Sequence, residues 1–268
     1  PARSCWQPDV NTLAIFGCPR SGTSWLGQLF NSSEAVLYRY QPLFAYEFKD
    51  WFGRHGVSPE SLAAFHAALQ GATSEFVLQS LRPPKLAEPT HLVWKEVRFH
   101  RLMAPLLAQL GLDRIVYLYR SPVEVLNSWY QAPKEFRAGQ DIFAEYLHAP
   151  SKNTDPSEFN GFAKWKESMQ LALELQAAHP GRVSLVSYER LRTRPLATLG
   201  HLFDACGLAL TPQVRAFIDE STSRQDDDAY GVFRSERSSI RLPAGIVREI
   251  EQDSEAAALL RRADALAL

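Results

Sequence analysis

Short apolar runs alternate with longer segments of helical periodicity along the chain. The runs at residues 13–16, 92–94, 114–119 and 183–186 are predicted as buried strands, because continuous apolar runs bounded by turn residues are typical of parallel sheets. Apolar residues spaced three and four apart predict helices between and after these strands. The predicted helices cover residues 24–31, 100–110, 123–130, 159–179, 196–206, 212–220 and 242–266.

This alternation of strands and helices predicts an α/β fold, with a parallel sheet that helices cover on both faces. The chain has 268 residues, a length that fits a single domain over residues 1–268 with residues 1–10 as an N-terminal extension. Ligands in such folds bind at the carboxyl ends of the strands, so we expect the chemistry in the loops that follow them.

The overall composition excludes several classes of protein. Apolar residues make up 46% of the chain and charged residues 22%, which is ordinary for a soluble globular protein. The net charge of −1 gives no bulk basicity that would indicate a nucleic-acid partner, so any anion site must be local. Three cysteines without clustered spacing argue against a disulfide framework or a zinc site. No apolar stretch reaches the length of a membrane span.

The composition also bears on location. The chain is rich in Ala, Leu and Arg, which favours a bacterial source and a cytoplasmic location. It does not begin with Met, so a trimmed leader or membrane anchor before residue 1 stays open. The oligomeric state cannot be read from these features.

A loop rich in Gly and Ser follows the first predicted strand, with the sequence GCPRSGTSW over residues 17–25. Its glycines are spaced as in the P-loop pattern G-x-x-x-x-G-K-[ST], in which backbone N–H groups and a helix N-terminus hold a phosphate. Here Thr23 stands at the position of the P-loop lysine, and the cation is Arg20 instead. A kinase would thereby lose its main charge on the transferring phosphate. The loop therefore favours transfer of a less charged sulfuryl group without Mg²⁺, with a P-loop kinase for a small metabolite as the alternative.

Residues 19–26, PRSGTSWL, resemble the 5′-phosphosulfate loop of the sulfotransferases that use 3′-phosphoadenosine-5′-phosphosulfate (PAPS). That loop has the usual form Pro-(Lys/Arg)-Ser-Gly-Thr-(Thr/Ser)-(Trp/Phe)-Leu. The resemblance implies a P-loop-type fold and transfer of a sulfuryl group from PAPS, with release of PAP and no metal. It also implies that Arg20 is catalytic. The donor-binding residues that it implies here are Arg20, Ser21, Gly22, Thr23, Ser24 and Trp25.

A second motif follows the clearest predicted strand. Residues 120–128 resemble the family's 3′-phosphate motif Arg-(Asp/Asn)-Pro-x-x-x-x-x-Ser, which implies that Arg120 and Ser128 hold the ribose 3′-phosphate. Arg gives a bidentate clamp on a phosphate, and Ser128 lies about two helical turns after it. Ser121 departs from the usual acidic or amide residue, a change that a helix cap tolerates.

Two later segments add to the resemblance. Residues 186–191 are similar to the family's Tyr-Glu-Asp-Leu segment, which implies that Tyr188 packs near the adenine. A strand-end tyrosine that covers the core is equally compatible with this sequence. Residues 233–237 resemble the basic stretch that closes over the 3′-phosphate, which implies roles for Arg234 and Arg237. The last 30 residues resemble the carbohydrate, Golgi-type branch more than the small-phenol branch.

The catalytic base is the least defined part of the predicted site. Lys95, at the end of the second predicted strand, resembles the lysine of the carbohydrate-type Lys-x-x-Arg segment and is expected to stabilise charge on the bridging oxygen. Val97 stands where small-phenol enzymes place a histidine base. Gln41 stands where carbohydrate-type enzymes often have a glutamate, and an amide cannot act as a base. Glu47 is the nearest carboxylate and is taken as the candidate base.

The acceptor side is predicted from two loops that follow strand ends. Residues 131–156 are rich in charge, Gly and Pro and could form a lid or line the acceptor site, and residues 44–56 are rich in aromatic side chains. The acceptor is a small molecule or a glycan that presents a hydroxyl or, less well, an amine. A non-catalytic PAP-binding module stays a further alternative, because the expected base is missing.

Overall fold

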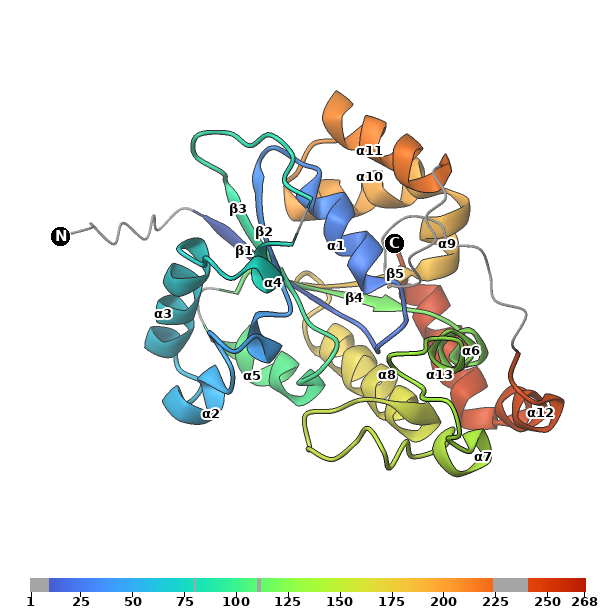
Figure 1. Ribbon diagram of the computed structural model, residues 1–268. Helices are drawn as coiled ribbons and strands as arrows, with labels where there is room; N and C mark the ends of the chain where they lie inside the picture. The colour runs from blue at the N-terminus through green and yellow to red at the C-terminus, as the bar shows by residue number, and fades with distance from the viewer. Residues whose placement is uncertain (1–9, 80, 110–111, 224–240) are drawn as a thin grey trace.

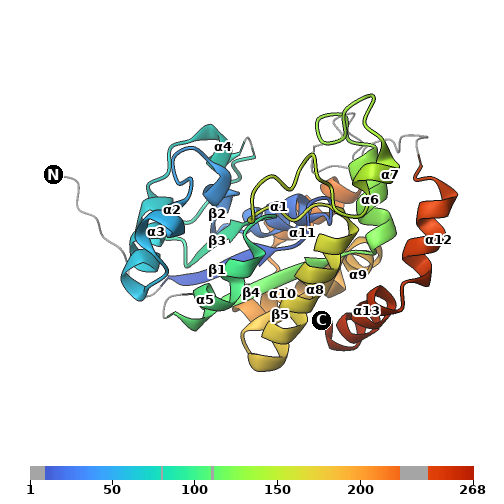
Figure 2. The same ribbon diagram turned by 90° about the horizontal axis from the view of Figure 1, so that it is seen from below.

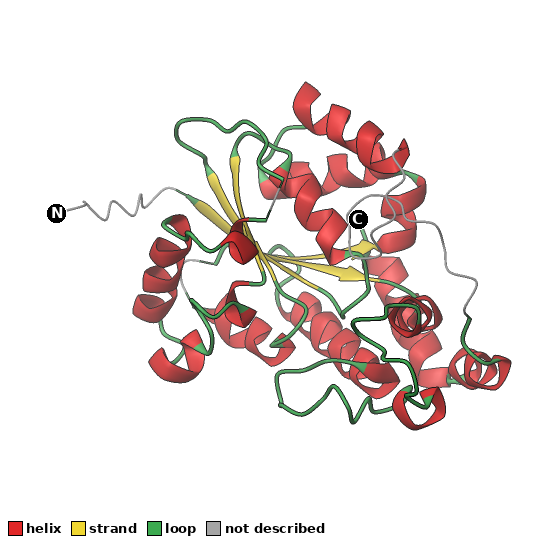
Figure 3. Cartoon of the chain, viewed as in Figure 1, coloured by secondary structure: helices red, strands yellow, loops and turns green. Residues whose placement is uncertain are grey.

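The computed structural model describes residues 10–79, 81–109, 112–223 and 241–268. Within these ranges the chain forms a parallel sheet of five strands, which Figure 3 shows in yellow between the helices. The strands are β1 (Asn11–Phe16), β2 (Val36–Tyr40), β3 (His91–Lys95), β4 (Arg114–Tyr119) and β5 (Val183–Ser187). Their order across the sheet is β2-β3-β1-β4-β5. The predicted α/β fold is confirmed, and β2 is a strand that the apolar pattern missed.

Side chains alternate between the two faces of the sheet, so each strand contributes to two cores. Leu13 and Ile15 of β1 lie in one core, and Ala14 and Phe16 lie in the other. The helices over the first core are α1 (Thr23–Asn31), α9 (Tyr188–Thr193), α10 (Pro195–Cys206) and α11 (Pro212–Ser223).

The second core is larger and is covered by most of the remaining helices. Figures 1 and 2 show α2 and α3 at one edge of this layer and α12 and α13 at the opposite edge. The helices of this layer are α2 (Trp51–His55), α3 (Pro59–Gln70), α5 (Met103–Ala108), α8 (Gly161–Ala178), α12 (Ala244–Gln252) and α13 (Ser254–Leu266). The shorter elements at the sheet's carboxyl edge are η1 (Pro42–Phe44), α4 (Glu75–Leu78), η2 (His100–Leu102), α6 (Pro122–Tyr130) and α7 (Ile142–Glu145).

Two predicted elements differ from the observed ones, and one strand was not predicted, each for local reasons. Residues 242–266 form two helices, because Asp253 ends α12 and its carboxylate accepts the Ala256 N–H at 2.8 Å to cap α13. Residues 100–110 begin with the 3₁₀ turn η2 before the short helix α5. The run VLYRY of β2 contains Arg39, a charged residue that breaks the apolar pattern yet is buried.

The chain reverses its direction of winding at β1, because β3 lies on one side of that strand and β4 on the other. Parallel strands end at the same edge, so the loops after all five strands meet there, and the loop after β1 lies at the reversal point. Among the residues that the structure describes, no helix has the length and apolar character that crossing a bilayer requires.

Candidate active site

The loop between β1 and α1 is shaped by two glycines. A Cβ on Gly17 would collide with the carbonyl oxygen of Leu118, so only glycine lets β1 and β4 lie this close. Gly22 has a φ of 95°, and a Cβ there would lie 2.5 Å from the ring of Tyr188. Both positions therefore require glycine for the loop to close over the strand ends.

The loop places the N-terminus of α1 at the carboxyl edge of the sheet. The first backbone N–H groups of a helix have no acceptor within the helix, and among the described side chains none caps this helix start. Ser21 and Thr23 are buried in the loop, whereas Ser24 and Trp25 are half-buried at its surface. These N–H groups and the helix dipole make the loop suited to bind an anion.

The structure brings the two predicted phosphate motifs together. The Arg20 Nε donates to the Ser128 hydroxyl at 3.2 Å, although these residues are 108 positions apart. Arg120 donates in turn to the Arg20 carbonyl at 3.3 Å. Arg20 has a φ of 69°, which is uncommon for a side chain with a Cβ and turns this carbonyl toward Arg120. The 5′ and 3′ motifs therefore form one continuous site.

Arg120 occupies the centre of this site. It forms an ion pair with Glu124 at 2.9 Å, and its guanidinium carbon lies 4.4 Å from the ring centre of Tyr188. Its buried Nε has no hydrogen-bond acceptor among the described residues. A buried donor without a partner is costly, so this Nε is available to a ligand oxygen.

Tyr188 forms the wall of the site on the α9 side. Its ring meets that of Trp25 edge to face, with the ring centres 6.3 Å apart, and lies against Gly22. The Trp25 indole N–H donates to the Ser221 hydroxyl at 3.0 Å, which holds this ring in place. Tyr188 thus contacts residues of both predicted phosphate motifs.

Lys95 lies at the carboxyl end of β3 and is 1% exposed. Its ammonium lies 4.1 Å from the ring centre of Tyr40, the last residue of the neighbouring strand β2. Burial lowers the pKa of Lys95, and the nearby Arg20 charge lowers it further, whereas Tyr40 and Glu96 oppose this change. The Lys95 ammonium is therefore buried at the end of β3, within electrostatic range of Arg20.

Tyr40 is a site residue that the sequence did not single out. Its hydroxyl is in polar contact with the side chains of Ser24, Gln41 and Lys95, which belong to three different segments. The Lys95 charge lowers the pKa of the Tyr40 phenol more than burial raises it. The only sequence signal for Tyr40 was an aromatic residue at the end of a strand beside the phosphate loop. Because β2 was not predicted, Tyr40 was not recognised as a strand-end residue.

Two carboxylates lie near the strand ends: Glu47 is more exposed than the half-buried Tyr40, and Glu96 is less exposed. Glu47 is exposed, and its charge acts on Arg39, whose guanidinium donates to the carbonyl oxygens of Leu69 and Gln70 at the end of α3. Glu96 is fully buried and accepts the Leu43 N–H at 2.7 Å. Burial raises the pKa of Glu96 to about 8.

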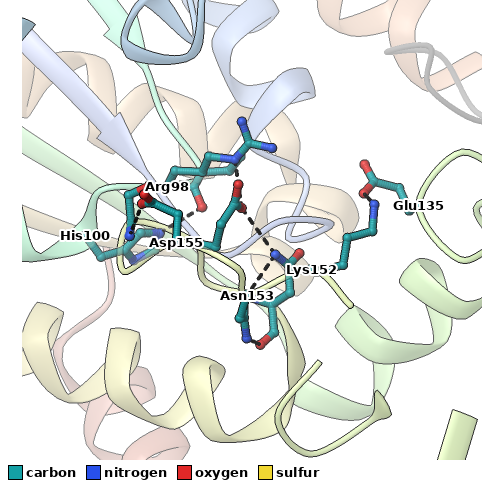
Figure 4. A network of polar contacts seen from close by, with 10 residues as sticks. Arg98, His100, Glu135, Lys152, Asn153 and Asp155 are labelled. Carbon is teal, nitrogen blue, oxygen red and sulfur yellow. Dashed lines mark hydrogen bonds and ion pairs between the residues drawn. The ribbon is translucent and has the colours of Figure 1, made fainter. Parts of the chain in front are cut away.

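A chain of polar contacts links the end of the segment at residues 131–156, through Asn160 and Glu158, to Arg98 (Figure 4). Arg98, just after β3, forms an ion pair with Glu158 at 2.8 Å, and Lys152 forms one with Glu135 at 3.3 Å. Asn153 donates to the carbonyl oxygen of Asn160 at 2.8 Å. The Lys152 ion pair lies within the segment, whereas Asn160 connects the end of the segment to Glu158 and thereby to Arg98.

A cavity of about 300 Å³ opens between this region and the aromatic segment. Its walls include Trp51 and Phe52 from α2, Phe99 just before η2, and Pro156 at the end of the segment 131–156. The two regions that the sequence assigned to the acceptor side therefore do meet at the same edge of the sheet. Arg234 and Arg237, the other predicted phosphate ligands, lie outside the described residues.

The chain belongs to the sulfotransferase family, because the family model described as "Sulfotransferase domain" matches residues 11–241. It is 31% identical over 300 residues to carbohydrate sulfotransferase 3 of Mus musculus, covering 88% of this chain and 63% of that protein. It is 34% identical over 266 residues to carbohydrate sulfotransferase 6 of Homo sapiens, covering 76% and 65%. The chain thus spans slightly under two thirds of these relatives' length.

Solved structures show the same fold. The sulfotransferase from Alicyclobacillus acidocaldarius matches with a TM-score of 0.54 at 12% identity, covering 96% of this chain and 95% of that one. Mouse sulfotransferase SULT7A1 complexed with PAP matches with a TM-score of 0.53 at 13% identity, covering 98% and 90%. The predicted P-loop-type fold and the carbohydrate-type resemblance are confirmed.

The predicted cytoplasmic location is wrong. The relatives that cover most of this chain are animal carbohydrate sulfotransferases, and these belong to the Golgi-type branch. Location is set by targeting segments, and the Ala, Leu and Arg content of a catalytic fold carries no such signal.

Proposed function

We propose that the protein transfers a sulfuryl group from PAPS to a hydroxyl of a carbohydrate and releases PAP. The observation that carries this proposal is the junction of the two phosphate motifs through Arg20, Ser128 and Arg120. PAPS has two phosphate positions on one adenosine, and a site with two joined anion-binding motifs matches that requirement. A nucleoside triphosphate such as ATP has no 3′-phosphate, so it would not need the motif that contains Arg120 and Ser128.

Each donor-side residue that the structure describes has a role that its position supports, and the sequence resemblance adds two arginines. The loop from Ser21 to Trp25 binds the 5′-phosphosulfate through its N–H groups and hydroxyls. Arg20 and Lys95 stabilise the negative charge that develops on the departing phosphate oxygen. Arg120 and Ser128 bind the 3′-phosphate, with Arg234 and Arg237 as further ligands, and Tyr188 packs against the adenosine. These fixed positive charges replace the metal ion that phosphoryl transfer uses.

The acceptor is proposed to be a carbohydrate for two reasons. The relatives that match most of the chain carry that class of acceptor in their names. An aromatic shelf also leads away from Lys95, formed by Tyr40, Phe76 and Phe44, with ring centres 5.3 Å and 5.8 Å apart along the series. Phe44 is 48% and Phe76 39% exposed, and exposed aromatic rings suit the apolar face of a sugar.

Isothermal titration calorimetry with PAP and with Mg·ATP tests the class of donor. PAP should bind without metal and more tightly than Mg·ATP, because Arg120 and Ser128 bind a phosphate that ATP lacks. A preference for Mg·ATP would contradict the proposal and favour the kinase. A protein that binds PAP but transfers nothing from PAPS to any glycan would instead be a PAP-binding module.

A further inference from the structure

Sulfuryl transfer to a hydroxyl needs a group that accepts the acceptor's proton, and the obvious candidates are poorly placed. Glu96 is fully buried, and its Oε1 accepts the Leu43 N–H. His100 is buried too, stacks on Phe159 with ring centres 4.4 Å apart, and has its pKa lowered to about 4 by burial. Glu47 is accessible, and its charge acts on Arg39.

The charge of Glu47 also acts on Arg39, whose side chain leaves β2 on the face away from the phosphate loop. Arg39 and Tyr40 are neighbours in a strand, so their side chains leave it on opposite faces. Arg39 points to the end of α3 in the second layer, whereas Tyr40 contacts Ser24 of α1 in the first. The phosphate loop lies on the Tyr40 side.

Tyr40 is the polar group that lies between donor and acceptor. Its hydroxyl contacts Ser24 of the phosphate loop and Lys95, while its ring begins the aromatic shelf with Phe76 and Phe44. The side chain is half-buried, with its hydroxyl toward Ser24 and Lys95 and its ring against Phe76. On the basis of the proposed transfer reaction, we infer that Tyr40 is the catalytic base, with Lys95 as the cation that stabilises its phenolate.

The electrostatic surroundings of Tyr40 support this role. Lys95 on β3 lowers the pKa of the phenol, and the polar contacts to Ser24 and Gln41 lower it as well. On its own strand, Tyr38 is the other titratable group that interacts with it. From α4 the contact is Phe76, while Glu75 of that helix is exposed and ion-paired with Arg82. Glu96 directly follows Lys95 and also interacts with this ammonium, so the phenol shares its cation with that buried carboxyl group.

The reaction step then balances as follows. The acceptor oxygen attacks the sulfur of PAPS and forms the new S–O bond. The bond from sulfur to the 5′-phosphate oxygen breaks, and its electron pair leaves on PAP, where Arg20 stabilises the charge. The acceptor proton passes to the phenolate oxygen of Tyr40, and the phenol releases it to solvent after PAP departs.

Tyr40→Phe tests this role, because it removes the hydroxyl and keeps the ring contacts with Phe76 and Lys95. We expect kcat for sulfuryl transfer to fall roughly 10²- to 10⁴-fold. The dissociation constant for PAP and the melting temperature should stay close to those of the wild type. A variant that loses PAP affinity or melting temperature in proportion to kcat would show a structural role and overturn the inference.

Two matched controls sharpen the result. Tyr38→Phe removes a phenol from the same face of the same strand, and that hydroxyl is buried without a hydrogen-bond partner among the described residues. Glu47→Gln removes the candidate base that the sequence favoured. Both variants should keep the wild-type kcat. A loss of kcat in Glu47→Gln with normal turnover in Tyr40→Phe would assign the base to Glu47.

The pH profile gives a readout that a structural role would not move. The wild-type kcat should rise with pH and level off above the pKa of the Tyr40 phenol, and Tyr40→Phe should lose this rise. Incorporating 3-fluorotyrosine at position 40 lowers the phenol pKa and should move the rise to lower pH. An unmoved rise overturns the inference while leaving the sulfotransferase proposal intact. Failure of the wild type to transfer sulfuryl from PAPS would instead overturn the proposed function.

Discussion

Replacing Arg120 by alanine should weaken the binding of PAP far more than the binding of AMP, which lacks the 3′-phosphate. The Arg120 side chain is only 13% exposed, so a phosphate held by it is largely shielded from water. Its Nε has no acceptor among the described residues, so a bound phosphate competes with the ion pair to Glu124, which is 41% exposed, and with the contact to the Arg20 carbonyl.

The size of the effect follows from the contacts that are lost. A hydrogen bond to a charged group contributes about 1.5–3 kcal/mol, and a guanidinium makes two such bonds to one phosphate. We take about 3 kcal/mol for the pair, because the ion pair with Glu124 must weaken when phosphate binds. At about 1.4 kcal/mol per factor of ten, PAP affinity should fall on the order of 100-fold. AMP affinity should fall only a few-fold, through the lost contact with the Arg20 carbonyl.

Calorimetric titration of both nucleotides into wild type and Arg120→Ala measures the ratio of the two affinities. Arg192→Ala is the matched control, because its ion pair with Glu189 is about half exposed on both sides and should contribute about 0–1 kcal/mol. Arg120→Lys keeps the charge without the two-pronged geometry and should fall between wild type and alanine. A PAP-to-AMP ratio that Arg120→Ala leaves unchanged would refute the assignment of the 3′-phosphate to this residue.

Two further predictions concern the loop and the buried acid beside it. Gly22→Ala places a Cβ 2.5 Å from the Tyr188 ring at a φ of 95°, so we expect PAP affinity to fall at least about tenfold and unfolding free energy to drop by roughly 1–3 kcal/mol; unchanged calorimetry and thermal melting would contradict this. Glu96 has its pKa raised from 4.5 to about 8, so the folded chain keeps a proton that the unfolded chain releases. Stability should therefore fall as pH rises from 4.5 to about 8 and then level off, and Glu96→Gln should make urea denaturation less dependent on pH across that window. An equal pH slope in wild type and variant would show that Glu96 does not titrate in this way.

The phosphate loop was predictable because its requirements are local. Gly17 and Gly22 are fixed by backbone geometry, and the residues between them are contiguous, so a single stretch of sequence encodes the whole feature. Arg120 was also found from its own motif at a strand end. Its contact with the Arg20 carbonyl could only be inferred from the expectation that parallel strands end together.

The acceptor side was less predictable because it depends on distant contacts and on a strand with a charged residue inside it. Arg39 interrupts the apolar run of β2, yet it is buried because its guanidinium donates to carbonyl oxygens at the end of α3. Without β2, Tyr40 had no predicted place at the sheet edge. The contact between Arg98 and Glu158 joins residues 60 positions apart, which no local pattern encodes.

The most direct test of the central claim is transfer of labelled sulfate from PAPS to a panel of neutral and acidic oligosaccharides in the presence of a metal chelator. The account predicts that label appears on an oligosaccharide in equal amount to the PAP released, and that Arg20→Ala abolishes the transfer while remaining folded. Wild-type protein that binds PAP yet moves no label to any oligosaccharide, or that needs a divalent metal to do so, would contradict it.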